Sequence, residues 1–150
     1  MTAITYVIDT REQKPYEFTN SESVSTVHRK LDAGDYSAVG YENVVAVERK
    51  SLDDFAQTVI RDWDRFHREL KKLQTYKAAC IVVEASIKDI VKNRYRVNAV
   101  PNSVIGRAMS ICVDYNIPLY FLNNRAECSF FVEHWIGRQV FKIEKERVIG

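Results

Sequence analysis

The sequence lacks a long apolar segment, since its longest purely apolar stretch is the six residues 78–83. A helix that crosses a bilayer needs about 20 apolar residues, and the N-terminus also lacks the basic and apolar regions of a signal peptide. Cysteine is scarce too, and Cys80, Cys112 and Cys128 are widely spaced among apolar residues, which favours reduced core thiols over disulfides or a zinc site. We therefore expect an intracellular protein that does not associate with membranes.

Glycine and proline are also few, with 5 and 3 in 150 residues, and no linker rich in proline, glycine or serine divides the chain. A composition of 46% hydrophobic and 28% charged residues excludes the disordered and low-complexity classes. A length of 150 residues is that of one ordinary domain. We predict a single globular domain over residues 1–150.

No excess of one charge indicates a polyanionic partner, because 22 basic against 20 acidic residues leave a net charge of +2. The distribution of charge is more informative. Residues 90–113 contain no acid but four basic side chains, Lys92, Arg94, Arg96 and Arg107. This segment is a candidate phosphate-binding strip, and an ordinary solvated surface is the alternative.

Hydrophobic periodicity predicts an α/β protein with a central mixed β-sheet flanked by helices. The expected order is four strands, two helices, then strand, helix, strand and helix. The first of these helices begins after Ser51, a good N-cap with Asp54 three residues later. Strands are expected at 3–9, 24–31, 35–39, 44–50, 79–84 and 117–121, and the later helices at 63–76, 102–115 and 124–141.

The segments 35–39 and 44–50 flank a turn-like sequence, which predicts a hairpin with two opposed acids. If the turn is centred between Tyr41 and Glu42, Asp35 lies opposite Glu48, and like charges so placed destabilise a sheet. A divalent cation would offset this repulsion, particularly with Asp9 at the end of a neighbouring strand, and a protonated carboxyl pair is the alternative. The register is decisive, because a shift by one residue turns Asp35 to the other face.

Strand alternation places Lys50 on the same face as Glu48 and turns Arg49 away, where Arg49 could pair with an acid on the opposite face. A cation beside a carboxylate-bound metal is suited to hold or deprotonate a water molecule and to neutralise charge that develops on a phosphate. The combination of three acids and this lysine therefore predicts metal-dependent hydrolysis of phosphodiesters.

The same residues resemble a known signature. Gly34-Asp35, Glu48-Arg49-Lys50 and Asp54 are similar to the GD…ERKxxxD motif of the XPF-type structure-specific nucleases. The likeness extends along essentially the whole chain, through segments that resemble the opening strand, the next helix, the central strand, and the penultimate helix and strand of that family: 7–12, 65–76, 81–84 and 100–121. The resemblance implies a restriction-endonuclease-like fold.

The resemblance also implies site roles. Asp9, Asp35 and Glu48 would bind Mg²⁺ or Mn²⁺, and Lys50 would assist the nucleophilic water. Arg11, Glu12 and Arg49 would complete the active site, and Arg11 and Arg65 would contact DNA. Independently of the resemblance, Arg94 and Arg96 of the basic segment are further candidates for contact with DNA. Family members typically continue into a tandem helix-hairpin-helix module, which these 150 residues do not contain.

Local alternatives exist for several of these residues. Arg11 and Glu12 could form a loop salt bridge, Arg65 could pair with Glu69 four residues later, and Asp54 could act mainly as a helix cap.

The resulting function is a Mg²⁺- or Mn²⁺-dependent DNA endonuclease, as used in DNA repair, that cleaves at branched DNA or at junctions between single and double strands. The alternative is a catalytically silent DNA-binding or scaffolding pseudonuclease, although silent copies lose the acids or the lysine that this chain retains. A sequence-specific restriction-type enzyme is a third possibility, without an identifiable base-reading element. Phe130, Phe131 and Trp135 favour a homodimer through the C-terminal helices, because the family buries a comparable surface. No small-molecule cofactor is expected.

Overall fold

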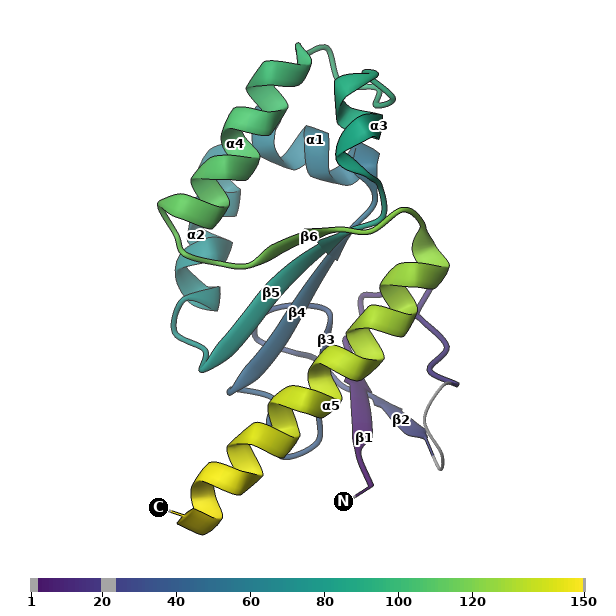
Figure 1. Cartoon of the computed structure of the whole chain (residues 1–150), viewed down its shortest axis with the longest axis vertical. Helices are drawn as coiled ribbons and strands as arrows, with labels where there is room; N and C mark the ends of the chain where they lie inside the picture. The colour runs from purple at the N-terminus through teal and green to yellow at the C-terminus, as the bar shows by residue number, and fades with distance from the viewer. Residues whose placement is uncertain (1–2, 20–23, 150) are drawn as a thin grey trace.

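A six-stranded mixed sheet forms the centre of the computed structural model, which describes residues 3–19 and 24–149 (Figure 1). Its spatial order is β2-β1-β3-β4-β5-β6. β3 pairs antiparallel with β1 and β4, whereas the β1–β2, β4–β5 and β5–β6 pairs are parallel. The strands are β1 (Thr5–Ile8), β2 (Ser25–His28), β3 (Tyr36–Ala38), β4 (Val45–Lys50), β5 (Ala78–Val83) and β6 (Leu119–Phe121). The mixed sheet flanked by helices is therefore confirmed.

Helices cover both faces of the sheet. They are α1 (Leu52–Arg61), α2 (Trp63–Leu73), α3 (Ile87–Val91), α4 (Pro101–Val113) and α5 (Arg125–Ile149). α5 packs on one face, and the other helices pack on the opposite face. Within the described part of the chain, no helix combines the length and apolar character needed to cross a membrane.

Three element boundaries differ from the sequence-based prediction by more than two residues. β2 ends at His28, because the Leu31 N–H turns away to the Asp9 carboxylate. α2 ends at Leu73, after which the chain closes in tight turns. The short α3 was not predicted, since five residues are too few to show helical periodicity, and α5 continues well beyond residue 141.

β4 is buried on both faces and directs alternate side chains into two separate cores. Val45 and Val47 pack on the α5 side, whereas Ala46 packs with the other helices. Because side chains alternate along a strand, Glu48 and Lys50 lie on the same face of the sheet as Ala46, and Arg49 lies on the same face as Val47. The last three residues of β4 therefore project to both faces of the sheet.

The β3–β4 hairpin has the predicted register, with Tyr36 opposite Val47. The Asp35 N–H donates to the Val47 carbonyl at 2.7 Å, and the Asp35 carboxylate accepts from the Arg49 N–H at 2.7 Å, so Asp35 lies beside the end of β4 that carries Glu48. Gly34 permits this approach, because its φ of +77° is left-handed and an added Cβ would lie 3.0 Å from the Val47 oxygen.

The chain turns directly from β4 into α1. The Ser51 hydroxyl accepts a hydrogen bond from the Asp54 N–H at 3.2 Å and caps the helix, as predicted. Because β1 and β4 run in the same direction, Asp9 and Glu48 lie toward the same end of the sheet. The start of β1 and the end of α5 lie at the opposite end (Figure 1).

Candidate active site

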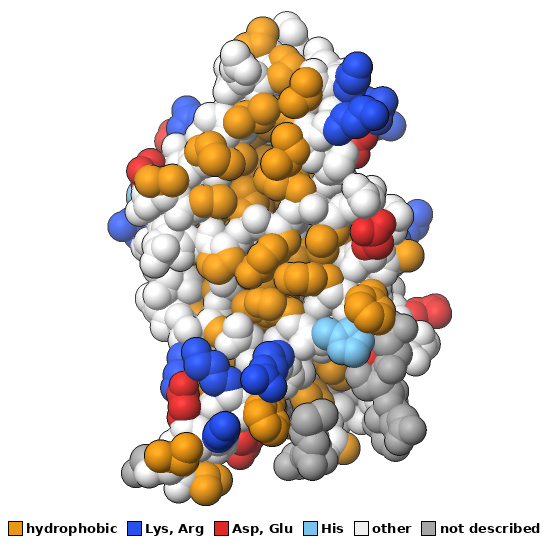
Figure 2. Space-filling view, viewed as in Figure 1, with side chains coloured by type: hydrophobic (Ala, Val, Ile, Leu, Met, Phe, Trp, Pro, Cys, Tyr) orange, Lys and Arg blue, Asp and Glu red, His pale blue; other side chains and the backbone are white. Residues whose placement is uncertain are grey.

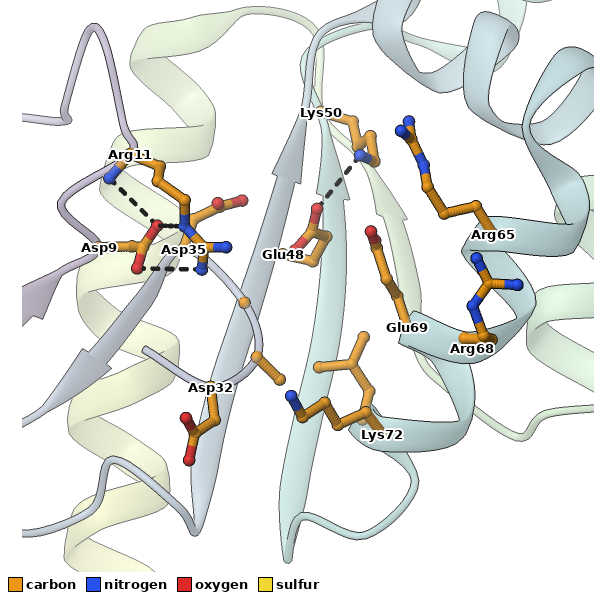
Figure 3. A pocket seen from close by; sticks show the side chains of 13 residues that line it. Asp9, Arg11, Asp32, Asp35, Glu48, Lys50, Arg65, Arg68, Glu69 and Lys72 are labelled. Carbon is orange, nitrogen blue, oxygen red and sulfur yellow. Dashed lines mark hydrogen bonds and ion pairs between the residues drawn. The ribbon is translucent and has the colours of Figure 1, made fainter. Parts of the chain in front are cut away.

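A pocket of about 490 Å³ lies beside the hairpin, between the loop before β3, the end of β4 and helix α2 (Figure 3). Five acidic and five basic side chains line it: Asp9, Asp32, Asp35, Glu48 and Glu69, and Arg11, Lys50, Arg65, Arg68 and Lys72. Six of these ten were singled out from the sequence. The structure therefore brings together the residues predicted on β1, the hairpin and α2.

Asp35 and Glu48 form the centre of this pocket. Burial, together with the charge of Glu48, holds the pKa of Asp35 well above its ordinary value. Burial also raises the pKa of Glu48, although Lys50 opposes that shift. The raised pKa values mean that the two carboxylates are costly to ionise together, as expected for the pair of repelling acids that the sequence predicts here.

Lys50 is the immediate partner of Glu48. Its Nζ lies 3.2 Å from Glu48 Oε2, and the two side chains are only 15% and 14% exposed. Burial acts to lower the pKa of Lys50, but the charge of Glu48 and other acids outweighs it and raises the pKa. Lys50 is therefore a charged hydrogen-bond donor here, which favours electrostatic assistance over proton abstraction.

Asp9 is saturated with hydrogen-bond donors. Its carboxylate accepts from Arg11 Nε at 2.7 Å and from the Leu31 N–H at 2.8 Å. Burial acts to raise the pKa of Asp9, but the Arg11 side chain and these backbone N–H groups lower it overall. Arg11 thus pairs with Asp9 rather than with Glu12, the loop pair considered from the sequence. Asp9 is 1% exposed while Arg11 is 66% exposed, so the arginine reaches solvent.

The three predicted metal ligands line one pocket but do not converge as a ready ligand set. Within residues 3–19 and 24–149, no group of three or more His, Cys, Asp and Glu side chains is arranged to hold a metal ion. Asp9 is directed to Arg11 instead. Asp35 and Glu48 nevertheless fit a divalent cation, because hard carboxylate oxygens are the ligands that Mg²⁺ and Mn²⁺ prefer and a cation would relieve the repulsion between them.

Arg49 and Glu12 do not line the pocket. Arg49 donates two hydrogen bonds of 2.9 Å to Glu84, so it pairs with an acid on the other side of β4, as strand alternation predicts. Glu12 lies 3.9 Å from Arg49 and accepts a hydrogen bond of 2.9 Å from the Tyr36 hydroxyl. The structure thus places these two residues behind the hairpin, where they support it.

Helix α2 forms one wall of the pocket. Arg65 lies 3.5 Å from Asp62 rather than pairing with Glu69 as considered from the sequence. Glu69 instead points toward Glu48 and Lys50 (Figure 3) and raises the pKa of both. Sequence reasoning assigned no site role to Glu69, Arg68 or Lys72, although their spacing from Arg65 places them on one helix face.

Arg94 and Arg96 lie outside the pocket. Arg94 pairs with Asp89 at 2.7 Å, and Arg96 lies 3.4 Å from Asp53. Tyr95 between them is buried, and its hydroxyl donates to the Ala99 carbonyl. The basic segment is therefore partly neutralised by its own acids, and its predicted contact with DNA stays a prediction.

Comparison with known proteins identifies the family. The ERCC4 domain model matches residues 8–134. A curated relative, the "Putative ATP-dependent RNA helicase MJ1505" of Methanocaldococcus jannaschii, is 27% identical over 124 residues, which are 83% of this chain but 14% of that protein.

Two solved structures have the same fold. XPF from Aeropyrum pernix matches with a TM-score of 0.67 and 22% identity over 90% of this chain and 61% of that one. XPF from the same organism in complex with DNA matches with a TM-score of 0.67 and 23% identity over 93% and 66%. This chain spans less than two thirds of each of these proteins. It belongs to the ERCC4 domain family and has the restriction-endonuclease-like fold that the two XPF structures share.

Proposed function

We propose that this chain is a Mg²⁺- or Mn²⁺-dependent endonuclease that hydrolyses DNA phosphodiester bonds at branched DNA or at junctions between single and double strands. The observation that supports this best is that Asp35, Glu48 and Lys50 line one pocket, where the charge of Glu48 raises the pKa of Asp35 and Lys50 lies 3.2 Å from Glu48. Membership of the ERCC4 domain family supports it as well. The complex of the similar XPF from Aeropyrum pernix with DNA supports DNA as the substrate.

In this proposal, Asp35 and Glu48 hold the divalent metal. When bound, such an ion stabilises charge on the phosphate and lowers the pKa of a bound water. The Lys50 ammonium donates to a phosphate oxygen and stabilises the charge that develops there. Asp9 becomes available as a third ligand when Arg11 exchanges the Asp9 carboxylate for a phosphate, an exchange that the exposure of Arg11 permits.

Helicase activity is not proposed for this chain, although the curated relative is named as a helicase. The chain covers 14% of that protein, and the sequence contains no G-x-x-x-x-G-K-[ST] phosphate-binding loop. Nuclease chemistry is thus the activity that the residues present support.

We also propose a homodimer through α5. Figure 2 shows hydrophobic side chains spread over the face to which α4, β6 and α5 contribute. Met109, Val113 and Phe130 are 44%, 74% and 53% exposed. β6 is an edge strand, and an apolar face beside a free strand edge is typical of an interaction surface.

A cleavage assay tests the enzymatic proposal. Labelled single strand, linear duplex, flap, splayed-arm and nicked-junction DNA would each be incubated with Mg²⁺ or Mn²⁺, with Asp35→Asn as the control. We expect metal-dependent cleavage of the branched substrates by the unmodified chain alone. Binding of these substrates without cleavage under any of these conditions would favour the pseudonuclease alternative.

A further inference from the structure

Helix α2 places three cations along one wall of the pocket. Arg65, Arg68 and Lys72 are separated by three and four residues, so they share one helix face, and all three line the pocket. At a rise of about 1.5 Å per residue, they extend over about 10 Å. Figure 3 shows them across the pocket from Asp9 and Arg11, with Lys72 beyond Glu48 at the end near Asp32.

The charges of the pocket make these cations necessary for a polyanionic ligand. Five carboxylates line the pocket, and they repel a phosphodiester. Of the two basic residues outside α2, Arg11 is paired with Asp9 and Lys50 with Glu48. The positive charge that is free to attract a ligand therefore comes from α2.

Of the three cations, Arg68 and Lys72 have the fewest polar contacts within the protein. Across residues 3–19 and 24–149, neither side chain has an ion pair or a hydrogen bond, whereas Arg65 lies 3.5 Å from Asp62. Both are exposed. Neither side chain stabilises the fold through a polar contact, so polar contacts within the protein do not explain why these two cations line the pocket.

We propose that Arg68 and Lys72 form a binding surface for the sugar-phosphate backbone of the DNA strand next to the scissile phosphate. The identity of the polyanion rests on the proposed function. Arg68 and Lys72 lie about 6 Å apart along the α2 axis, a separation that lets each cation contact one of two neighbouring phosphates of a strand. The strand then runs along α2 toward Lys72, while the phosphate to be cleaved lies at Asp35, Glu48 and Lys50.

The helix itself supplies a matched control. Lys71 is adjacent to Lys72 on α2 but does not line the pocket, and Arg61 at the end of α1 is likewise exposed and outside it. The double variant Arg61→Gln/Lys71→Gln therefore removes the same two residue types, and the same charge, as Arg68→Gln/Lys72→Gln.

The experiment measures DNA binding as a function of salt. A fluorescent flap substrate would be titrated at several NaCl concentrations and constant Mg²⁺, with every variant in the Asp35→Asn background to prevent cleavage. Each lost phosphate contact lowers the slope of log K against log salt by about 0.9 on duplex or about 0.7 on single strands. We expect Arg68→Gln/Lys72→Gln to lower the slope by about 1.4 to 1.8 and the control pair to leave it unchanged.

The outcomes separate this inference from the proposed activity. Equal slopes for the two double variants, or no DNA binding at all, would overturn the α2 surface, even if the unmodified chain cleaves DNA. A loss of slope confined to Arg94→Gln/Arg96→Gln would overturn it in favour of the basic segment. A selective effect of the α2 pair, with no cleavage by the unmodified chain, would support the surface and refute the nuclease. Thermal unfolding of each variant confirms that it is folded.

Discussion

At the scale of single residues, the site combines groups that are costly to place together. Asp35 and Glu48 repel one another, and Asp9 depends on Arg11. The first relation could be predicted from the sequence, because a hairpin register follows from the position of its turn. The second could not, since several basic side chains were available to Asp9, and the choice depends on how the loops pack. The effect of Glu69 on the pKa values of Glu48 and Lys50 could not be predicted either, because it also depends on how α2 packs beside β4.

Replacing Asp35 by Asn should stabilise the metal-free protein. The folded state raises the pKa of Asp35, so wild-type stability falls as the pH rises from about 4 through that raised pKa. The amide lacks this repulsion and still offers an oxygen to the Arg49 N–H. We expect a gain of about 1 kcal/mol at neutral pH, measured by thermal unfolding in EDTA, and a variant less stable than wild type would contradict the repulsion.

Replacing Lys50 by Gln should affect rate more than metal affinity. Loss of a donor aimed at developing charge costs on the order of 10²-fold or more in kcat. Glu48 would lose its cationic partner, so Mn²⁺ binding should be retained or strengthened. Calorimetric Mn²⁺ titration beside single-turnover cleavage tests this, and abolished Mn²⁺ binding would assign Lys50 to assembly of the site instead.

At the scale of elements, a polar cluster behind the hairpin joins β4, β5, α5 and the loop after β1. Glu84, directly after β5, accepts from Arg49 at 2.9 Å and from the Tyr16 hydroxyl at 2.5 Å. Arg125 at the start of α5 lies 3.6 Å from Glu84 and donates to the carbonyls of Lys14 and Pro15. This cluster fixes the loop that carries Arg11 and Glu12.

Replacing Glu84 by Gln should destabilise the fold by about 3 kcal/mol, because Arg49, whose side chain is only 17% exposed, would lose its closest carboxylate partner. Burial acts to raise the pKa of Glu84, but Arg49 and Tyr16 lower it overall. Its stabilising contribution is therefore present above the ordinary carboxyl pKa and is lost as the pH falls through the lowered one. Urea unfolding of both proteins between pH 3 and pH 7 should show the difference shrinking toward the acid end.

Replacing Arg125 by Met should loosen the loop over residues 9–16. The side chain stacks 4.7 Å from the Tyr16 ring and holds two loop carbonyls. We expect a loss of about 2 kcal/mol and slower cleavage with unchanged Mn²⁺ affinity. The control is Arg138→Met, whose guanidinium lies on Phe141 of the same helix; equal effects from both variants would argue against a role of Arg125 at the site.

Most elements could be predicted because their periodicity is long enough to detect. The hairpin, the Ser51 cap and the strand after α2 all follow from local sequence. α3 is too short for such a signal, and its Ser86–Asp89 capping box stabilises it locally. The extra length of α5 follows from contacts such as that of Ile143 with the core, which exist only in three dimensions.

At the scale of the whole molecule, the two layers have different tasks. The pocket lies on the side covered by α1 to α4, with α2 as one wall, whereas α5 covers the other face and exposes apolar side chains. Composition could predict neither the position of the pocket nor that of the apolar face, because a net charge of +2 and ordinary hydrophobicity are compatible with many surfaces.

Replacing Phe130 by Glu tests the proposed dimer. The side chain is 53% exposed and contacts the His134 ring on the same helix, so its removal should cost less than about 0.5 kcal/mol of folding stability. We expect the wild-type chain to be dimeric by light scattering and the variant to be monomeric. A monomeric wild-type chain, or a variant that remains dimeric, would exclude this face as the contact.

The start of β1 and the end of α5 lie at the end of the sheet remote from the ends of β1 and β4, which carry Asp9 and Glu48 (Figure 1). A tether, dye or immobilising surface joined to either end would therefore leave the pocket facing outward. Single-molecule recording of DNA handling by this domain can thus use terminal attachment without obstructing access to the acids.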